Sequence, residues 1–456
     1  MTSILWFRRD LRLLDHPALL SASEDGAVVP LVVLEPGSLD AATPHVAGYL
    51  RCVAALAESI ASRGGRLVVR TGDPADVVPR LAREVGAGRV HVTAESEPDR
   101  RRRDQQVREV LDGLGVAFVA TGTPYAIGPG VITKSDGDPY KVFTPFATAW
   151  RDHGAPGPAP LPTVSWVTGV ESEQIPTPVE VGVGLPALGE RAALERWNDF
   201  RDEGLERYAA DRDRPDLPGT SQMSVHLAHG TIHPRTMLAD IAAHPAGQTE
   251  GARTFATELV WREFYADVLW HRPDSAWNDL RTALAGMEYD DPQSDPRAAD
   301  RLAAWKEGRT GHPIVDAGMR QLLATGWMHN RLRMITASFL CKDLHVWWPH
   351  GARHFLDHLL DADLANNNHG WQWVAGTGTD AAPYFRVFNP WSQGAKFDPR
   401  GDYVRRWVPE LAGLAEADVH DLRAVSTVPG YPAPIVDHAE ERREALRRYE
   451  EVRAAP

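Results

Sequence analysis

The chain has 456 residues, and 43% of them are hydrophobic, which is enough to build two or three domains with their own cores. Its formal net charge of −13 excludes a general polyanion binder, so any nucleic-acid site must be a local basic patch. Two cysteines, Cys52 and Cys341, are too few for a disulfide framework or a structural zinc site, and no metal is expected. The sequence has neither a secretion signal nor a long apolar run, so we expect a cytoplasmic protein without a membrane span.

Residues 3–120 alternate short apolar runs with helical patterns, which predicts a doubly wound parallel sheet of the α/β class. The apolar runs lie at 4–7, 28–34, 66–69, 90–93 and 117–120, and the helical patterns lie at 46–63, 74–85 and 101–114. No Gly-x-Gly-x-x-Gly follows the first run, so the common dinucleotide fingerprint is not supported. The charged residues 8–12 that follow it either line a ligand cleft at the carboxyl end of the strand or form a solvated turn.

Residues 121–190 are rich in proline and glycine and predict a linker, with one apolar island at 140–150 that is able to dock on a domain. From residue 189 onward, helical patterns dominate and strand signals are scarce. The helical patterns lie at 194–208, 254–270, 314–325, 330–345 and 352–360. We therefore expect an α/β domain at 1–125, a linker at 126–190 and an all-α domain at 191–456.

Two short patterns in the second half have both a functional and a structural interpretation. The hydroxyl residues of 219–224 (Gly-Thr-Ser-Gln-Met-Ser) either form an anion site suited to a diphosphate or simply cap a helix. Glu258, Trp261 and Tyr265 share one face of a helix. There, a carboxylate beside an indole either holds and stacks a nucleobase or belongs to an ordinary packing face.

Residues 326–373 mix tryptophans with Arg, Asn, Asp and His at a density that protein cores avoid. The mixture fits a planar, redox-active or base-like ligand, or else a buried helical core with a satisfied polar network. Residues 305–355 hold seven Lys and Arg against three acids, a local charge of +4 that predicts a basic patch. Asp361 and Asp363 either ligate a metal or pair with Arg331 and Arg333 beside a flat heterocycle. No Ser/His/Asp set or Cys/His pair is evident.

Seven longer motifs span nearly the whole chain. They include Leu-Trp-Phe-Arg-Arg-Asp-Leu-Arg at 5–12, Glu-Leu-Val-Trp-Arg-Glu-Phe-Tyr at 258–265 and Gly-Trp-Met-His-Asn-Arg-Leu-Arg-Met-Ile at 326–335, and the others lie at 140–146, 311–322, 361–368 and 376–386. Together they resemble the photolyase/cryptochrome family, and within it the class I cyclobutane pyrimidine dimer photolyases. The resemblance implies an N-terminal antenna domain, a C-terminal helical domain that holds FAD, and light-driven electron transfer from reduced FAD to pyrimidine dimers in DNA.

The resemblance also implies which residues surround the flavin. Asp361 would pair with Arg333 beside the ring, Asp363 would hold the imide edge, and Asn367 would sit at the reactive nitrogen. An asparagine at 367 suits an anionic reduced flavin, because the amide adds no negative charge. The residues implied to contact the phosphates and sugar of FAD are Tyr208, Thr220, Ser221, Gln222, Met223 and Ser224.

The dimer itself would be flipped out of the duplex into a pocket. There, Glu258 and Asn330 would hydrogen-bond the lesion, while Trp261 and Trp373 would pack against its pyrimidines. Met334 stands where (6-4) photolyases usually carry a histidine, which favours cyclobutane dimers as the substrate. The residues implied to bind the DNA are Arg262, Arg331, Arg386 and Gln393, with Arg331 and Arg386 on its phosphates.

Two further sites follow from the resemblance. Trp371 and Trp348 match the inner members of a photoreducing tryptophan chain, whose outer member is either Tyr289 or a neighbouring tryptophan. Residues implied to bind an antenna chromophore are Arg9, Arg51, Glu95 and Glu97. The pattern favours 8-hydroxy-5-deazaflavin over a methenyl folate or no chromophore, although the arginines at 100–103 also fit a solvated helix face.

We therefore expect light-driven repair of cyclobutane pyrimidine dimers by a monomer that needs no obligate protein partner. It would be associated with the nucleoid when bound to damaged DNA. The chain stops after one charged helix at 437–453, whereas cryptochromes commonly carry a long tail, so repair is favoured over signalling. The alternatives are a cryptochrome-type photoreceptor and a photolyase for another lesion.

Overall fold

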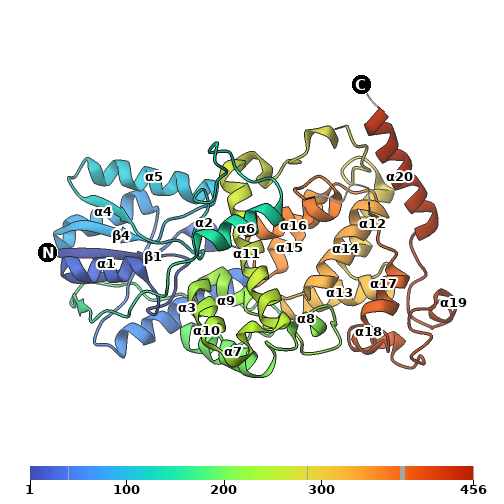
Figure 1. Ribbon diagram of the computed structural model, residues 1–456, viewed down its shortest axis with the longest axis horizontal. Helices are drawn as coiled ribbons and strands as arrows, with labels where there is room; N and C mark the ends of the chain where they lie inside the picture. The colour runs from blue at the N-terminus through green and yellow to red at the C-terminus, as the bar shows by residue number, and fades with distance from the viewer. Residues whose placement is uncertain (40, 285, 381–385, 455–456) are drawn as a thin grey trace. The chain divides into compact units, whose positions relative to one another are not determined.

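The computed structural model describes residues 1–39, 41–284, 286–380 and 386–454. It divides into two compact units. Unit 1 comprises Met1–Val181, Leu185–Glu206 and Ser221–Pro273, and unit 2 comprises Gly182–Gly184, Arg207–Thr220 and Asp274–Pro456. Every strand of the described residues lies before residue 167, and helices dominate afterwards, which confirms the expected class (Figure 1). The division into domains at 1–125, 126–190 and 191–456 stays a prediction.

Unit 1 begins with a parallel sheet in the order β3-β2-β1-β4-β5, and β6 pairs with β2. The strands are β1 (Thr2–Phe7), β2 (Ala27–Leu34), β3 (Val68–Thr71), β4 (Ala87–Val92), β5 (Ala117–Ala120) and β6 (Ser165–Trp166). β1 is central, and its Ile4 lies opposite Val29 of β2 and Val90 of β4. The first five strands overlap the five expected runs, while β6 is too short to produce a pattern.

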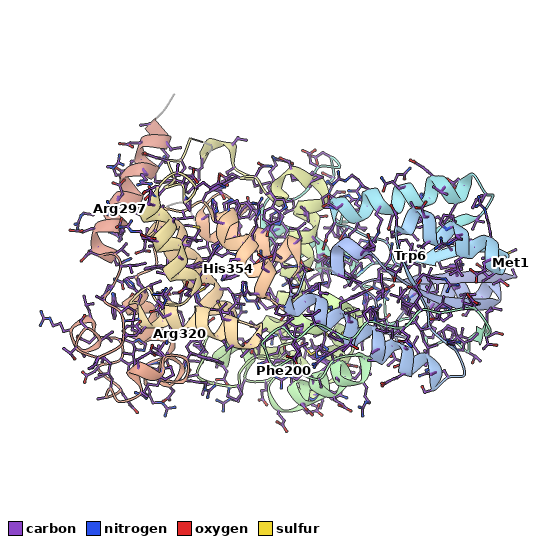
Figure 2. The ribbon with its side chains drawn as sticks, turned by 180° about the vertical axis from the view of Figure 1, so that it is seen from behind. Met1, Trp6, Phe200, Arg297, Arg320 and His354 are labelled. Carbon is purple, nitrogen blue, oxygen red and sulfur yellow. The ribbon has the colours of Figure 1, made fainter. Side chains whose placement is uncertain are left out.

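Helices cover both faces of the sheet, as the doubly wound prediction requires. α1 (Pro17–Asp25) and α3 (Pro44–Ala61) pack on the face that receives Leu5 and Phe7. α4 (Pro74–Val85) and α5 (Pro98–Asp112) cover the other face, where Ile4 and Trp6 point (Figures 1 and 2). Alternate residues of β1 therefore enter different cores, which is the period of two expected of a strand buried on both sides.

The strand order also locates a crevice. From β1 the chain winds through β2 to β3 on one side, and then β4 and β5 follow on the other side of β1. The topological switch point therefore lies between β1 and β4, where α/β sheets bind ligands at the carboxyl ends of their strands. Arg8 follows β1 and Thr93 follows β4 at this edge, and an Arg8 guanidinium N–H donates to the Thr93 carbonyl.

The other helices of unit 1 are α2 (Pro36–Leu39), α6 (Phe143–His153), α7 (Glu190–Glu203), α9 (Ser224–His229), α10 (Pro234–Ala243) and α11 (Glu250–His271). The apolar island at 140–150 forms most of α6 and docks on α11, where Phe146 packs 5.1 Å from Phe264. The buried Glu263 carboxylate of α11 accepts the backbone N–H groups of Ala126, Ile127 and Gly128. The start of the expected linker is thus fixed to α11.

Unit 2 is helical around one core. Its helices are α8 (Tyr208–Asp211), α12 (Pro296–Lys306), α13 (Pro313–Thr325), α14 (Asn330–Lys342), α15 (Trp348–His358), α16 (Leu364–Ala375), α17 (Pro390–Phe397), α18 (Asp402–Trp407), α19 (Leu422–Val425) and α20 (His438–Ala454). Short 3₁₀ turns lie at Pro273–Ala276, Thr282–Leu284 and Pro409–Leu411, and a further one at Pro245–Gln248 belongs to unit 1. α14 packs against α13, α15 and α16, and its Phe339 is buried with Trp305 and Trp348. α20 forms one edge of this unit and leads to the C-terminus, and His354 lies buried among the helices (Figures 1 and 2).

Candidate functional site

An ion pair joins α14 to the segment before α16. Arg333 Nη2 lies 2.8 and 3.1 Å from the two carboxylate oxygens of Asp361, and Arg333 Nε donates to the carbonyl of Met328. The Asp361 side chain is only 2% exposed, so its charge requires a partner. The expected Arg333–Asp361 pair therefore forms, while its place beside a flavin ring stays a prediction.

Asp363 and Asn367 lie at the start of α16. Asp363 is the N-cap, and its Oδ1 accepts both the backbone and the side-chain N–H of Asn366. Asn367 Nδ2 donates to the carbonyl of Ala352 and to Asn368 Oδ1. Both amide hydrogens are thus engaged, and within the described residues Asn367 Oδ1 accepts no hydrogen bond. This half-buried, neutral oxygen is able to accept a hydrogen bond from a ring N–H, so the polar groups at the start of α16 fit a flavin.

The other polar side chains of α16 hold the segment 275–280. His369 Nε2 lies 3.0 Å from Ser275 Oγ, and Gln372 donates to the Ser275 carbonyl and accepts the N–H of Leu280. Asn368 donates to the carbonyl of Ala276. The polar mixture at 326–373 is therefore partly a satisfied core network. The core-network interpretation therefore holds for these side chains of α16, while a ligand beside Asp363 and Asn367 stays a prediction.

His369 belongs to this network and is held at both ring nitrogens. Its ring is buried, and Nδ1 lies 2.8 Å from the carbonyl of Ala365. Burial lowers the pKa of His369 to about 4, so the ring is neutral at physiological pH. The residue has a structural task and brings no positive charge to the start of α16.

The buried tryptophans Trp371 and Trp348 of unit 2 each pack against other aromatic rings. Trp371 is buried and packs edge-on against Trp305 and Phe355, with ring centroids 6.0 and 4.9 Å away. Trp348 is fully buried, and Trp347 lies edge-on to it with centroids 6.3 Å apart.

One carboxylate serves both neighbouring indoles, because Asp279 Oδ1 accepts the Nε1–H of Trp348 at 2.7 Å and of Trp347 at 3.3 Å. Asp279 was not predicted from the sequence, and Trp347 was not singled out there. The adjacent Trp-Trp pair was the available signal. The candidate outer residue, Tyr289, is half-buried, and burial raises the pKa of its phenol well above 10.

The implied phosphate and sugar contacts of FAD lie along 208–224. Tyr208 begins α8 and Thr220 ends the loop of unit 2, whereas residues 221–224 belong to unit 1. Ser221 is buried, and its Oγ accepts the N–H of Met223, so this hydroxyl acts as a local turn cap. Gln222 between them has a φ of +56°, a left-handed conformation that costs energy for a residue with a Cβ. Ser224 begins α9.

The lesion-binding candidates of unit 1 lie on α11. Trp261 stacks on Phe143 of α6, with centroids 3.5 Å apart and ring planes at 7°. Glu258 lies one turn earlier and is half-buried. Arg262 donates to the carbonyl of Pro124 at 2.9 Å, so its guanidinium is bound within unit 1 in this structure.

The lesion-binding candidates of unit 2 differ in exposure. Asn330 is exposed at the first position of α14, and Met334 and Trp373 are half-buried. Arg331 Nη2 lies 2.7 Å from Asp213 Oδ1.

The last two DNA-binding candidates lie beyond α16. The Arg386 carbonyl accepts a hydrogen bond from the buried Lys342, and Gln393 is half-buried on α17. Part of the motif at 376–386 falls on 381–385, outside the described residues.

The basic stretch at 305–355 is not a bare cationic surface. Arg320 Nη1 lies 2.8 Å from Glu410, Arg353 stacks over Trp277, and Lys342 is buried. Arg309, Arg331 and Arg333 are in ion pairs as well. Four of the seven cations in this stretch are therefore in ion pairs with acids, while the basic patch itself stays a prediction.

At the switch point of unit 1, the candidate antenna residues form a charged cluster. Arg9 Nη1 lies 2.5 Å from Glu97, and Arg9 Nη2 lies 3.0 Å from Glu95. Burial alone would raise the pKa of Glu95, but Arg9 and Arg100, with the arginines beside them, lower it to about 2. Residues 8–12 were expected either to line a cleft at the end of the strand or to form a solvated turn. Arg9 is buried at the edge of the crevice and is not part of a solvated turn. Arg51 is exposed on α3.

The arginines at 100–103 are not one solvated helix face. Arg101 stacks 3.7 Å over the ring of Trp270, and Arg103 lies 3.0 Å from Glu35. Arg102 is the mainly exposed member, with 76% of its side chain accessible. Most of this charged run therefore has folded partners.

Two kinds of feature are absent from the described residues. No helix there combines the length and apolarity needed to cross a bilayer. No cluster of three or more His, Cys, Asp or Glu side chains in the same residues is arranged to hold a metal ion.

Comparison with known proteins identifies the family. The model for DNA photolyase matches residues 3–165, and the model for the FAD binding domain of DNA photolyase matches residues 255–451. Two curated deoxyribodipyrimidine photo-lyases are similar over nearly their whole length. The Halobacterium salinarum protein is 39% identical over 99% of both chains, and the Streptomyces griseus protein is 42% identical over 96% of this chain and 97% of its own.

Solved structures agree. A class III photolyase from Agrobacterium tumefaciens has a TM-score of 0.89 at 36% identity, covering 100% of this chain and 98% of its own. A Synechocystis cryptochrome has a TM-score of 0.88 at 26% identity, covering 98% of each chain. The chain belongs to the DNA photolyase family, and it carries that family's FAD-binding domain in its helical half.

Proposed function

We propose that the chain is a deoxyribodipyrimidine photo-lyase that splits cyclobutane pyrimidine dimers in DNA under blue light, and that it belongs to class I. The observation that carries the proposal is similarity to curated enzymes of this activity along nearly the entire chain. The polar set in unit 2 supports it, because Arg333, Asp361, Asp363 and Asn367 offer the charges and acceptors that a flavin needs. Similarity to a class III photolyase makes class III the second candidate for the subgroup.

The chemistry that bound, reduced FAD supplies is a light-driven electron for the dimer, which the opened dimer gives back. This chain's residues bind and orient. Asn367 Oδ1 would accept a ring N–H, and the Arg333–Asp361 pair would lie beside the ring. Asp363 would hold the imide edge. Residues proposed to hold the remainder of the cofactor are Tyr208, Thr220, Ser221, Gln222, Met223 and Ser224.

For the lesion, Glu258 and Asn330 are proposed to hydrogen-bond the flipped bases, and Trp261 and Trp373 to pack against them. Met334 carries a thioether, which has no proton to donate, so acid–base chemistry of the kind a histidine supplies is not available there. This supports cyclobutane dimers over other photoproducts. Residues proposed to bind the DNA strand are Arg262, Arg331, Arg386 and Gln393.

A repair assay with dimer-containing DNA tests the proposal. We expect the dimers to disappear under blue light and to persist in the dark. A cryptochrome-type photoreceptor is the second candidate function, favoured by the likeness to the Synechocystis cryptochrome. Protein with intact reduced FAD that leaves cyclobutane dimers unrepaired under light would support that candidate, and turnover of a different photoproduct would indicate another lesion.

The electron that reduces the flavin is proposed to pass inward from Trp348 to Trp371. Trp347 is the neighbouring tryptophan in ring contact with Trp348, and both share Asp279. Trp347 is therefore our candidate for the outer member, with Tyr289 as the alternative.

The antenna is proposed to be 8-hydroxy-5-deazaflavin, held at the switch point of the sheet by Arg9, Arg51, Glu95 and Glu97. The buried charged cluster between β1 and β4 supports a ligand there. An absorption spectrum of the purified protein tests this. A near-ultraviolet folate band would indicate a methenyl folate, and a spectrum of flavin alone would indicate no antenna.

The protein is further proposed to act as a monomer in the cytoplasm, without an obligate protein partner, and to be associated with the nucleoid when bound to damaged DNA. Light scattering coupled to gel filtration measures the first point. A mass of one chain at working concentration supports it, and a dimer contradicts it.

A further inference from the structure

Arg331 is oriented from three sides within unit 2. Its guanidinium lies 4.4 Å above the ring of Phe397, and Nη1 lies 3.7 Å from Met334 Sδ. On the third side, Nη2 lies 2.7 Å from Asp213 Oδ1. The side chain of Arg331 is 18% exposed and that of Asp213 is 42% exposed, so the ion pair is at the surface.

Asp213 belongs to a braced loop, Arg207–Thr220. Arg207 Nε lies 2.9 Å from Asp211, and Arg214 forms a two-point pair with Asp216. Gly219 is packed so closely on Asp211 that an added Cβ would lie 2.6 Å from the Asp211 Cβ. The loop is therefore closed on itself, and the Asp213 carboxylate is presented to Arg331 by this framework.

We propose that the Asp213 carboxylate is an internal stand-in for a DNA phosphate, and that it is exchanged for that phosphate when DNA binds Arg331. The inference rests on the proposed function, in which Arg331 contacts the DNA backbone. A carboxylate and a phosphate present similar oxygen pairs to a guanidinium, so one site holds either anion. Asp213 then opposes DNA binding in two ways, because it occupies Arg331 and it repels the incoming phosphate.

Asp213 could also assist DNA binding by orienting Arg331, but this effect is weaker than its competition with the phosphate. The Phe397 ring and the Met334 sulfur hold the guanidinium whether or not Asp213 is charged. An exposed ion pair contributes at most modestly to stability, so its removal leaves the fold intact while freeing Arg331. Competition therefore outweighs orientation.

The test is the affinity of the FAD-loaded protein for a duplex with and without one cyclobutane dimer, measured in the dark by fluorescence anisotropy at fixed salt. Asp213→Asn should bind both duplexes about two- to fivefold more tightly than wild type. Glu307→Gln is the matched control: it removes one negative charge from another exposed acid of unit 2, which pairs with Arg309. This control should change the affinity by less than Asp213→Asn does.

A double-mutant cycle shows whether the gain passes through Arg331. Asp213→Asn should gain clearly less affinity in an Arg331→Ala background, where only the direct repulsion between Asp213 and the phosphate is left to remove. Arg331→Gln, which also lacks the charge, serves in the same role if the alanine variant does not fold. An equal gain in that background, or no gain in the wild-type background, overturns the exchange. Arg331→Ala that binds DNA as tightly as wild type would overturn the phosphate contact itself. If Arg331→Ala weakens DNA binding but Asp213→Asn does not strengthen it, the phosphate contact stands and only the exchange is overturned.

Discussion

Phe143 and Trp261 stack almost face to face, with centroids 3.5 Å apart and ring planes at 7°. Phe143 comes from α6, the apolar island in an otherwise irregular stretch, and Trp261 from the middle of α11. Phe264 meets both rings edge-on. The indole proposed to pack on the lesion is therefore held on one face by a residue far away in sequence, which explains how a tryptophan on a helix surface is kept in one orientation.

Removal of that support is the first prediction. Phe143→Ala should lower the free energy of unfolding by about 3 kcal/mol, because Phe143 is only 7% exposed and its loss leaves a cavity. The freed indole should also reduce the affinity for dimer-containing DNA. Phe143→Leu is the control. Because leucine retains most of the volume, this variant should lose less unfolding free energy and less affinity for dimer-containing DNA than Phe143→Ala. Urea unfolding and DNA titration measure the two effects; unchanged affinity in the alanine variant would show that Trp261 does not depend on the stack.

A second prediction concerns the Arg333–Asp361 pair. Arg333→Ala should lose both bound FAD and roughly 3 kcal/mol of stability, because it leaves the Asp361 carboxylate buried without its charged partner. Arg333→Lys keeps the charge but not the planar guanidinium. Its flavin content and stability should lie between those of wild type and Arg333→Ala. The flavin absorbance per chain after purification, together with urea unfolding, provides the measurement. Full flavin content in the alanine variant would contradict a place beside the ring.

The sequence predicted the architecture because its signals are local. Apolar runs separated by helical patterns are sufficient to place β1 to β5 and their helices. The specific pairing of Asp361 with Arg333 came from the family resemblance, because the residue types alone left a metal or either arginine open as the partner. Partners distant in sequence could not be read in the same way. The patterns gave no sign that His369 would bind Ser275, that Arg331 would pair with Asp213, or that Asp279 would serve two indoles.

Partners distant in sequence also matter for the basic stretch at 305–355. Counting charges along 305–355 assumes that neighbours in sequence share one surface. In the fold, Arg320 reaches Glu410 and Lys342 reaches the carbonyl of Arg386, both far along the chain. Net charge over a window is therefore a poor measure of surface potential in a helical unit whose side chains point in all directions.

The outer member of the electron chain gives a third prediction. Trp347→Phe should slow photoreduction of bound oxidised flavin by a large factor, while Tyr289→Phe should change it little. Trp347 is in ring contact with Trp348, whereas the Tyr289 phenol has a raised pKa and must release a proton when it is oxidised. The rate of flavin bleaching under blue light with a thiol reductant provides the comparison. If Tyr289→Phe is the slow variant and Trp347→Phe is not, then Tyr289 ends the chain.

The pH dependence of stability provides the last prediction, through His369. Burial holds the pKa of His369 near 4 in the folded protein, against an ordinary value of 6.5. Above pH 6.5 the ring is neutral in both the folded and unfolded states, so it adds no pH dependence. As the pH falls from 6.5 to 4, the unfolded chain takes up a proton that the folded chain refuses, and stability is lost. The difference corresponds to about 3 kcal/mol by pH 4.

His369→Gln should therefore reduce the loss of unfolding free energy between pH 7 and pH 4 by about that amount, measured by urea titration at each pH. At pH 7 the variant should itself be less stable, because the bonds to Ser275 and Ala365 are disturbed. The control His153→Gln removes an exposed histidine at the end of α6 and should leave the pH profile unchanged. Other buried histidines, His226, His312 and His329, also have pKa values lowered to about 4, so some acid sensitivity should remain. A profile for His369→Gln that parallels wild type would show that the ring accepts its proton without unfolding the segment it holds.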